Sequence, residues 1–175
     1  MKRLFLLVYI CILAFVAQAQ TKYKLRNNDI VTISYENGGT RTYLAVNDRG
    51  AIAAYTAVND NCLWKIVSCS YGEHSWGDQN VYYFQHYKTE QYLHVNATKD
   101  NRGRYDVRFV LGDNPSEIHQ NNPNNVNSND QGKYEHGRFH YYYDNTDFII
   151  QLENGNWVLK QGNNAPTLQV EKWEQ

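Results

Sequence analysis

Two histidines in an aromatic stretch are the residues whose type and spacing come nearest to a metal site. His136 and His140 are four positions apart in HGRFHYYYD, so a β-strand would place both on one face, near Glu135 and Asp144. In an extended strand, however, these histidines are about 13 Å apart, too far to share one zinc ion at about 2.1 Å per ligand unless a bulge intervenes. The spacing therefore predicts no metal site.

Motifs of known catalytic sites are missing from the sequence. It contains no Gly-x-Ser-x-Gly, no His-Glu-x-x-His, no glycine-rich phosphate loop and no Cys-x-x-Cys. A carboxylate pair for glycoside cleavage stays open, because the separation of such a pair depends on the fold, but no pair stands out. We therefore expect a protein that is not an enzyme and needs no cofactor, with a hydrolase of unrecognised residues as the alternative.

The N-terminus has the three regions of a signal peptide, which would occupy residues 1–19. Lys2 and Arg3 form a basic start, residues 4–16 are apolar, and Ala17-Gln18-Ala19 is a small-residue cleavage site. The apolar run is shorter than the about 20 residues that a transmembrane helix needs. The sequence therefore predicts cleavage after Ala19, a secreted or periplasmic protein, and no membrane insertion.

The charge balance excludes two kinds of partner. The chain has 17 Lys and Arg residues against 18 Asp and Glu residues, and loss of the leader removes Lys2 and Arg3 but no acid. The exported chain is thus mildly acidic and has no basic stripe, so neither nucleic acid nor anionic lipid is an expected partner. Residues 20–175 are long enough for a single domain with its own core.

Cys62 and Cys69 lie outside the leader, in an exported chain that permits disulfides. If residues 62–69 form one strand, seven steps of about 3.3 Å place the two Cα atoms about 23 Å apart and the side chains on opposite faces. A disulfide requires Cα atoms within about 7 Å, which would need a turn between Ile66 and Cys69. We expect the two thiols not to be bridged.

Composition and alternation predict an all-β chain. It has 15 tyrosines, 4 tryptophans and 11 glycines, and no apolar periodicity long enough for a helix. From Tyr43 to Trp64, a half-buried strand, an Asn/Asp/Gly turn and a second short strand lead to a third strand at residues 62–67, in which Trp64 is buried.

This strand–turn–strand pattern recurs twice in weaker form. Tyr43-Leu44 is matched by Tyr92-Leu93 and by Trp157-Val158-Leu159, and Lys172-Trp173 near the end repeats the tryptophan of the first unit. Each match is preceded by an alternating strand, at residues 31–35, 81–84 and 148–152. Three such units, each of about four strands, favour a closed three-fold fold.

Two segments are predicted to be loops. Residues 70–80, which include Trp76, would join the first two units. The Asn-rich residues 113–132 hold almost no side chain suited to a core and would form a mobile surface loop inserted between the second and third matches. The aromatic strand at residues 136–144 either opens the third unit or closes the second.

Two stretches carry a resemblance to a known family: NDNCLWKI at residues 59–66 and YYFQHYKTEQYLHV at residues 82–95. They resemble the ricin-B-type β-trefoil lectins and, more broadly, the trefoils that include fascin-like modules. The family's repeats typically carry Gln-x-Trp, whereas this chain has Cys62 two positions before Trp64 and Glu171 two before Trp173. The resemblance implies a β-trefoil, with an antiparallel β-sandwich as the alternative fold.

The resemblance also implies a ligand-binding site in the first repeat. In ricin-type repeats a sugar lies against an aromatic side chain and is held by an acid and an asparagine, and the matching positions here are Tyr55, Asp48 and Asn61. An aromatic ring packs against the C–H face of a pyranose, a carboxylate accepts from its hydroxyls, and an amide both donates and accepts. The alternative is that Asp48 and Asn61 cap turns and that Tyr55 only packs.

The function that the resemblance implies is a secreted, non-catalytic, lectin-like module whose partner is a glycan or glycoconjugate. The alternative is a secreted protein-binding or protease-inhibitor-like trefoil. An inhibitor needs one protruding loop, which the Asn-rich segment would offer. Fold analogy alone does not decide between these two functions.

Overall fold

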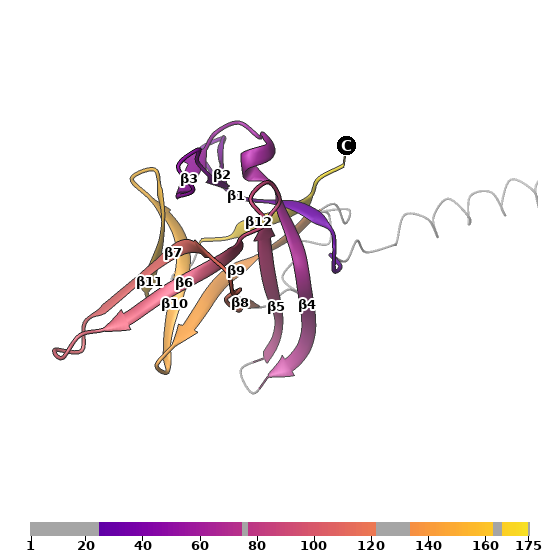
Figure 1. The fold of residues 1–175 in the computed structure, drawn as a ribbon. Helices are drawn as coiled ribbons and strands as arrows, with labels where there is room; N and C mark the ends of the chain where they lie inside the picture. The colour runs from indigo at the N-terminus through magenta and orange to yellow at the C-terminus, as the bar shows by residue number, and fades with distance from the viewer. Residues whose placement is uncertain (1–24, 75–76, 122–133, 163–165, 175) are drawn as a thin grey trace, which may run out of the picture.

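The computed structural model describes residues 25–74, 77–121, 134–162 and 166–174, and these form an antiparallel β-structure (Figure 1). The predicted all-β class is confirmed. The one helix among the described residues is a single 3₁₀ turn, η1 (Asp60–Cys62). In the described ranges no helix has the length and apolar character needed to cross a membrane. The predicted signal peptide, residues 1–19, lies outside them.

The strands follow one another in three groups of four. The first group is β1 (Ile30–Asn37), β2 (Thr40–Val46), β3 (Ile52–Tyr55) and β4 (Trp64–His74). The second is β5 (Gly77–His86), β6 (Tyr92–Lys99), β7 (Tyr105–Gly112) and β8 (Ile118–Asn121). The third is β9 (Tyr134–Tyr143), β10 (Thr146–Glu153), β11 (Asn156–Gln161) and β12 (Leu168–Lys172).

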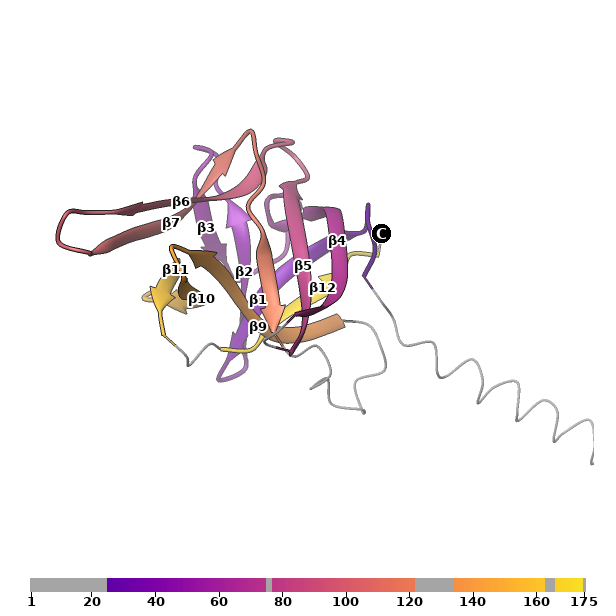
Figure 2. The ribbon, with the colours of Figure 1, turned by 90° about the horizontal axis from the view of Figure 1, so that it is seen from below.

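The first and last strands of the groups pair in a ring, so the sheet nearly closes into a barrel. Antiparallel pairing runs from β1 to β4, β5, β8, β9 and β12 and returns from β12 to β1. The join between β1 and β4 is short, with Ile30 opposite Lys65 and Val31 opposite Trp64. The inner strands of each group form the hairpins β2–β3, β6–β7 and β10–β11, and Figure 2 shows β6–β7 extending away from the barrel.

The core contains Trp64, as the sequence predicts. Its side chain is 0% exposed, and its indole N–H donates to the Leu44 carbonyl at 2.9 Å. The tryptophan near the C-terminus does not repeat this role, because Trp173 is 38% exposed. Leu168 and Val170 of β12 are fully buried instead. The predicted return of a core tryptophan in the third unit is therefore wrong.

The predicted elements around the first unit need two corrections. The strand expected at residues 62–67 begins only at Trp64, because the Asn59 side chain accepts from the Asn61 N–H and starts the 3₁₀ turn. The loop expected at residues 70–80 is largely strand, since β4 and β5 stay paired from Ser70 opposite Val81 to His74 opposite Gly77. Backbone pairing between β4 and β5 makes this segment a strand, although its polar sequence predicts a loop. Trp76 lies outside the described residues.

Cys62 and Cys69 are not bonded to each other, but the expected geometry is wrong. Cys62 lies in η1, not in a strand, and its thiol donates to the Ala57 carbonyl at 3.6 Å. Cys69 lies in β4 beyond a bulge between Ile66 and Ser68, with its sulfur 3.3 Å from the Asn27 side-chain oxygen. The two thiols are thus held in separate environments.

The predicted alignment of the third unit with the first two is wrong by one strand. The sequence pattern aligns residues 148–152 with residues 31–35 and 81–84, which lie in the first strands of their groups. Residues 148–152 belong to β10, the second strand of its group, and Trp157 lies in β11, the third. The aromatic stretch is β9 and opens the unit, because it pairs with both β8 and β12. The predicted loop at 113–132 is also wrong in its first part: Ile118 and Gln120 of β8 are 1% and 0% exposed. Residues 122–132 lie outside the described residues.

His86, the last residue of β5, contacts η1 and makes the stability of the protein depend on pH. Its Nε2–H donates to the Asn61 carbonyl at 3.2 Å, and its Nδ1 accepts from the Thr89 N–H at 3.3 Å. The ring is 1% exposed and lies edge-on to Trp64 at 5.2 Å. Burial, aided by the Lys88 charge, lowers the pKa of His86 although the Asn61 carbonyl acts in the opposite sense.

Because the folded pKa of His86 lies below the unfolded value of about 6.5, the unfolded chain takes up this proton first as the pH falls. The His86 contribution is therefore fully present above about pH 6.5 and is lost on acidification below it. We expect His86→Gln to reduce the loss of unfolding free energy between pH 7.5 and 5.5 in urea titrations. His94→Gln is the control, and an unchanged slope in His86→Gln would contradict the assignment.

Candidate functional site

Two of the predicted ligand-binding residues lie at opposite ends of the first hairpin. Asp48 is exposed in the β2–β3 turn, where Asn47 is the capping residue because its side-chain oxygen accepts from the N–H groups of Arg49 and Ala51, each at 3.0 Å. Tyr55 is half-buried at the end of β3, opposite Tyr43. Three residue steps separate the Tyr43 pair from the turn, or about 10 Å.

Asn61, the third predicted residue, lies in η1 and contacts the β5–β6 turn. Its side-chain oxygen accepts from the Lys88 ammonium group at 3.2 Å. No hydrogen bond between the described side chains joins Asp48, Tyr55 and Asn61. The joint role of Asp48, Tyr55 and Asn61 in binding a sugar stays a prediction. The contact of Lys88 with Asn61 is indicated by no sequence motif.

Tyr55 belongs instead to a row of four side chains that crosses four strands. Tyr55 of β3 faces Tyr43 of β2, Tyr43 faces Ser34 of β1, and Ser34 faces Gln169 of β12. Directly opposite residues of an antiparallel pair share one face of the sheet, with Cβ atoms about 5 Å apart. The neighbouring residues Val31 and Ile33 of β1 point into the core, so the row lies on the outer face.

Two polar atoms at the β1–β12 end of this row have no hydrogen-bond partner. They are Oγ of Ser34, a residue 1% exposed, and Oε1 of Gln169. A buried polar atom without a partner costs about 1 to 3 kcal/mol, so such atoms are unusual in a folded core. Two of them side by side, next to a pair of tyrosines, mark a place suited to a polar ligand.

An ion pair crosses this row from one side to the other. Arg41 of β2 lies opposite Glu36, and Glu171 of β12 lies opposite Thr32, so the two residues flank β1 on both sides of Ser34. The Arg41 guanidinium nevertheless contacts the Glu171 carboxylate at 3.1 Å and the Glu36 carboxylate at 3.2 Å. These side chains can meet only across the outer face of β1, above Ser34.

The electrostatics of Arg41 agree with that position. Partial burial acts against its charged form, but the hydrogen bond with Glu36 and electrostatic interaction with Tyr43 outweigh burial and raise the pKa of Arg41. The guanidinium thus lies beside Tyr43, within the row. The side chains of Arg41 and Glu171 are 33% and 34% exposed. A partly exposed ion pair of this kind contributes little to stability, on the order of 1 kcal/mol.

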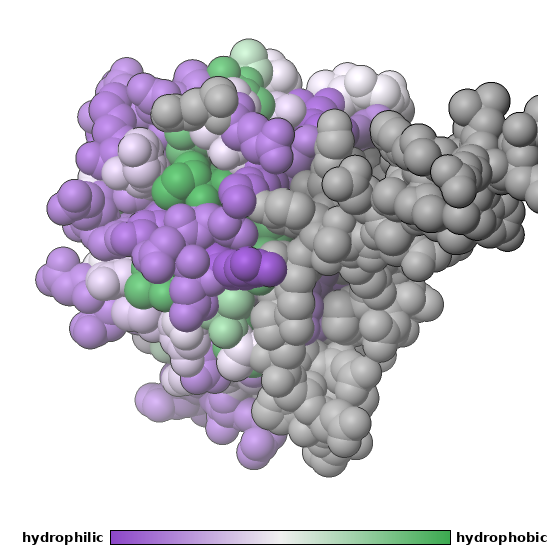
Figure 3. Space-filling view, turned by 90° about the vertical axis from the view of Figure 1, so that its right-hand side faces the viewer, coloured by the Kyte–Doolittle hydropathy of each residue, from purple (hydrophilic) through white to green (hydrophobic). Residues whose placement is uncertain are grey.

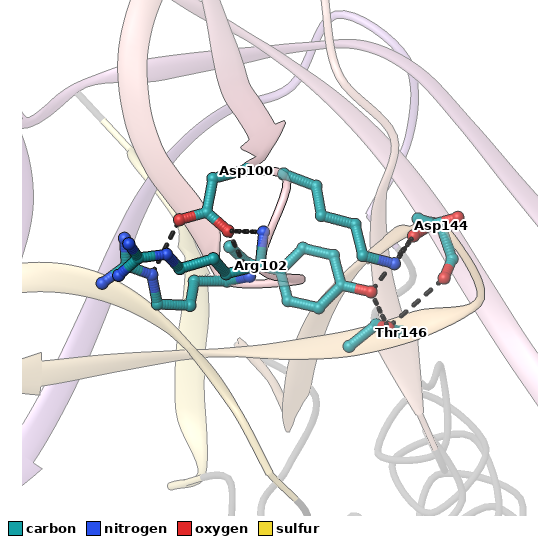
Figure 4. Close-up of polar contacts among 7 residues, drawn as sticks. Asp100, Arg102, Asp144 and Thr146 are labelled. Carbon is teal, nitrogen blue, oxygen red and sulfur yellow. Dashed lines mark hydrogen bonds and ion pairs between the residues drawn. The ribbon is translucent and has the colours of Figure 1, made fainter.

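A second group of polar contacts fixes the projecting β6–β7 hairpin (Figure 4). Close to its tip, Lys99 donates to the Asp144 carboxylate at 2.6 Å, and the Tyr105 hydroxyl donates to the same oxygen at 3.1 Å. Thr146 adds a hydrogen bond to the Tyr105 hydroxyl at 3.0 Å. The Lys99 and Tyr105 contacts lower the pKa of Asp144, and the Asp144 contact raises that of Lys99.

The tip of the same hairpin is ordered by one carboxylate. Asp100 accepts from the N–H groups of Arg102 and Arg104 at 2.8 and 2.9 Å, and from the Arg104 guanidinium at 2.7 Å. These donors lower the pKa of Asp100, the Arg104 contacts most. The tip is therefore a preformed turn that presents Arg102 at the surface.

Two of the residues first considered for a metal site, His140 and Asp144, make other contacts. Both carboxylate oxygens of Asp147 lie 2.9 Å from His140 Nδ1, and Asp144 belongs to the hairpin contacts. The side chains of Glu135 and His136 lie outside the description. Among the described residues, no group of three His, Cys, Asp or Glu side chains is placed to hold a metal ion.

One face of the molecule shows how polar the surface is. In Figure 3 hydrophilic residues cover most of the described surface on that side, and hydrophobic residues form small separate patches. No protein-family model matches the chain, and no curated protein matches it.

Proposed function

We propose that this chain is a secreted, non-catalytic β-trefoil that binds carbohydrate. The trefoil assignment is supported by the three groups of four strands, with the outer strands of each group in the ring and the inner strands in hairpins. The export assignment is supported by the signal-peptide pattern of residues 1–19.

The row Tyr55–Tyr43–Ser34–Gln169 is the observation that carries the binding proposal. Sugars combine an apolar C–H face with a rim of hydroxyls, so they suit an aromatic surface beside planar or hydroxyl groups that lack partners. Tyr43 and Tyr55 supply the aromatic surface, and Ser34 and Gln169 supply the polar atoms. Tyr55 keeps the aromatic role that the resemblance implies, and Tyr43 is added to it.

A glycan screen on the purified chain, followed by calorimetric titration of the best glycan, tests this function. Tyr43→Ala and Tyr55→Ala are expected to weaken binding by up to about tenfold, since each removes a ring from the surface. Asp48→Ala, in the exposed turn, is the control. If Asp48→Ala and Asn61→Ala weaken binding and Tyr43→Ala does not, the three-residue site predicted from the resemblance is the correct one.

Binding of a protein is the second candidate, and the β6–β7 hairpin favours it. The hairpin projects from the barrel, is paired over its full length, and is held in place by Lys99 and Asp144 (Figures 2 and 4). A rigid projecting element loses little freedom on binding, and arginine is frequent at binding hot spots. A tight one-to-one complex with a protease, abolished by Arg102→Ala and unaffected by Tyr43→Ala, would support this function over carbohydrate binding.

A further inference from the structure

We propose that the ligand on the outer face of β12–β1–β2–β3 carries a primary ammonium group, as an amino sugar does. The ammonium group would be held above Ser34 by the carboxylates of Glu36 and Glu171 and by the Gln169 carbonyl. This inference rests on the proposed carbohydrate-binding function and adds the chemical class of the sugar to it.

The charges around Ser34 favour a cation. One guanidinium, that of Arg41, is shared between two carboxylates, those of Glu36 and Glu171. The group of three thus carries a net negative charge, which repels a carboxylate-bearing sugar and attracts an ammonium group. A unit charge about 4 Å away is worth about 1 kcal/mol in water, or roughly a fivefold change in affinity.

The hydrogen-bonding needs of the site point the same way. Gln169 Oε1 is an acceptor without a donor, and Ser34 Oγ can accept as well as donate. Each carboxylate has a second oxygen that the Arg41 contacts at 3.1 and 3.2 Å do not use. An ammonium group offers three donors and no acceptor, so it complements a site that has more acceptors than donors.

In this proposal the ligand displaces the Arg41–Glu171 contact, which crosses β1 above Ser34. That contact joins two partly exposed side chains, so opening it costs little. Arg41 then remains hydrogen-bonded to Glu36 and is free to donate to a sugar hydroxyl, while the Tyr43 ring packs against the pyranose. Ser34 and Gln169, now uncovered, receive the donors of the ligand.

A charge series of matched sugars tests the proposal. Methyl glucosaminide, methyl glucoside and methyl glucuronide are titrated into the purified chain at low salt and followed by NMR. The ammonium sugar is expected to bind about fivefold more tightly than the neutral sugar, with the carboxylate sugar weakest. Raising the salt concentration should remove most of this preference, since the site is partly exposed.

Two variants locate the effect. Glu36→Gln with Glu171→Gln is expected to abolish the preference for the ammonium sugar over the neutral sugar, and Glu90→Gln, on the β5–β6 turn, is expected to keep this preference. Equal affinities for all three sugars, a reversed order, or a preference that survives in the double variant would overturn the proposal. Equal binding leaves carbohydrate binding intact, whereas failure of every glycan in the screen removes the proposed function as well.

Discussion

Replacing Trp64 with alanine is expected to lower the free energy of unfolding by about 3 to 5 kcal/mol, the usual cost of truncating a large core side chain. Trp64 is 0% exposed, opposes Val31 at the short join between β1 and β4, and donates to the Leu44 carbonyl. Its loss would leave a cavity, an unpaired carbonyl and a loosened His86 ring together. Urea unfolding followed by circular dichroism measures the change.

Trp173→Ala is the matched control for this substitution. Trp173 is 38% exposed, so its replacement is expected to cost less than about 1 kcal/mol. Losses of similar size in the two variants would show that Trp64 does not close the barrel. They would also remove the physical basis for the first repeat.

Gln120→Ala is expected to cost about 2 to 5 kcal/mol, although it removes a polar side chain. Gln120 Oε1 accepts from the Asn80 amide at 2.9 Å and from the Tyr82 hydroxyl at 3.0 Å, and all three residues are buried. The alanine variant takes an acceptor from two buried donors and adds a cavity. Thermal and urea unfolding would report the loss.

Tyr82→Phe separates the two causes. It removes one hydroxyl and leaves Gln120 bonded to Asn80, so we expect a cost of about 1 kcal/mol. If Gln120→Ala costs no more than Tyr82→Phe, the buried amide is not the acceptor on which the β5–β8 pairing depends.

The sequence predicts the all-β class correctly, but it predicts the bounds of the strands and the alignment of the third unit less well. Alternation and tyrosine content indicate strands, and Trp64 indicates a core position. These predictions succeed because the local alternation of apolar and polar residues reflects which side chains are buried. Gln120 shows where this fails. A glutamine in an Asn-rich stretch is predicted to be solvated, but Asn80 and Tyr82, from a strand distant in sequence, supply hydrogen bonds that allow its burial.

The candidate site is harder to predict because it depends on register. Tyr43, Ser34 and Gln169 come from three strands, and a shift of one residue in either pairing would move a member to the other face. Tyr55 could be named from the resemblance because it lies within one hairpin. Ser34 and Gln169 could not, since no local pattern links residues from the two ends of the chain.

The pairing of β12 with β1 also sets the order in which the chain can fold. One edge of β1 pairs with β2 and β4, which are synthesised soon after it, but the other edge is completed only by β12. Contacts between distant parts of a chain slow folding, because a long loop must close first. Until β12 is synthesised, the nascent chain has an open strand edge that can pair with another molecule, so incomplete chains are expected to be prone to aggregation.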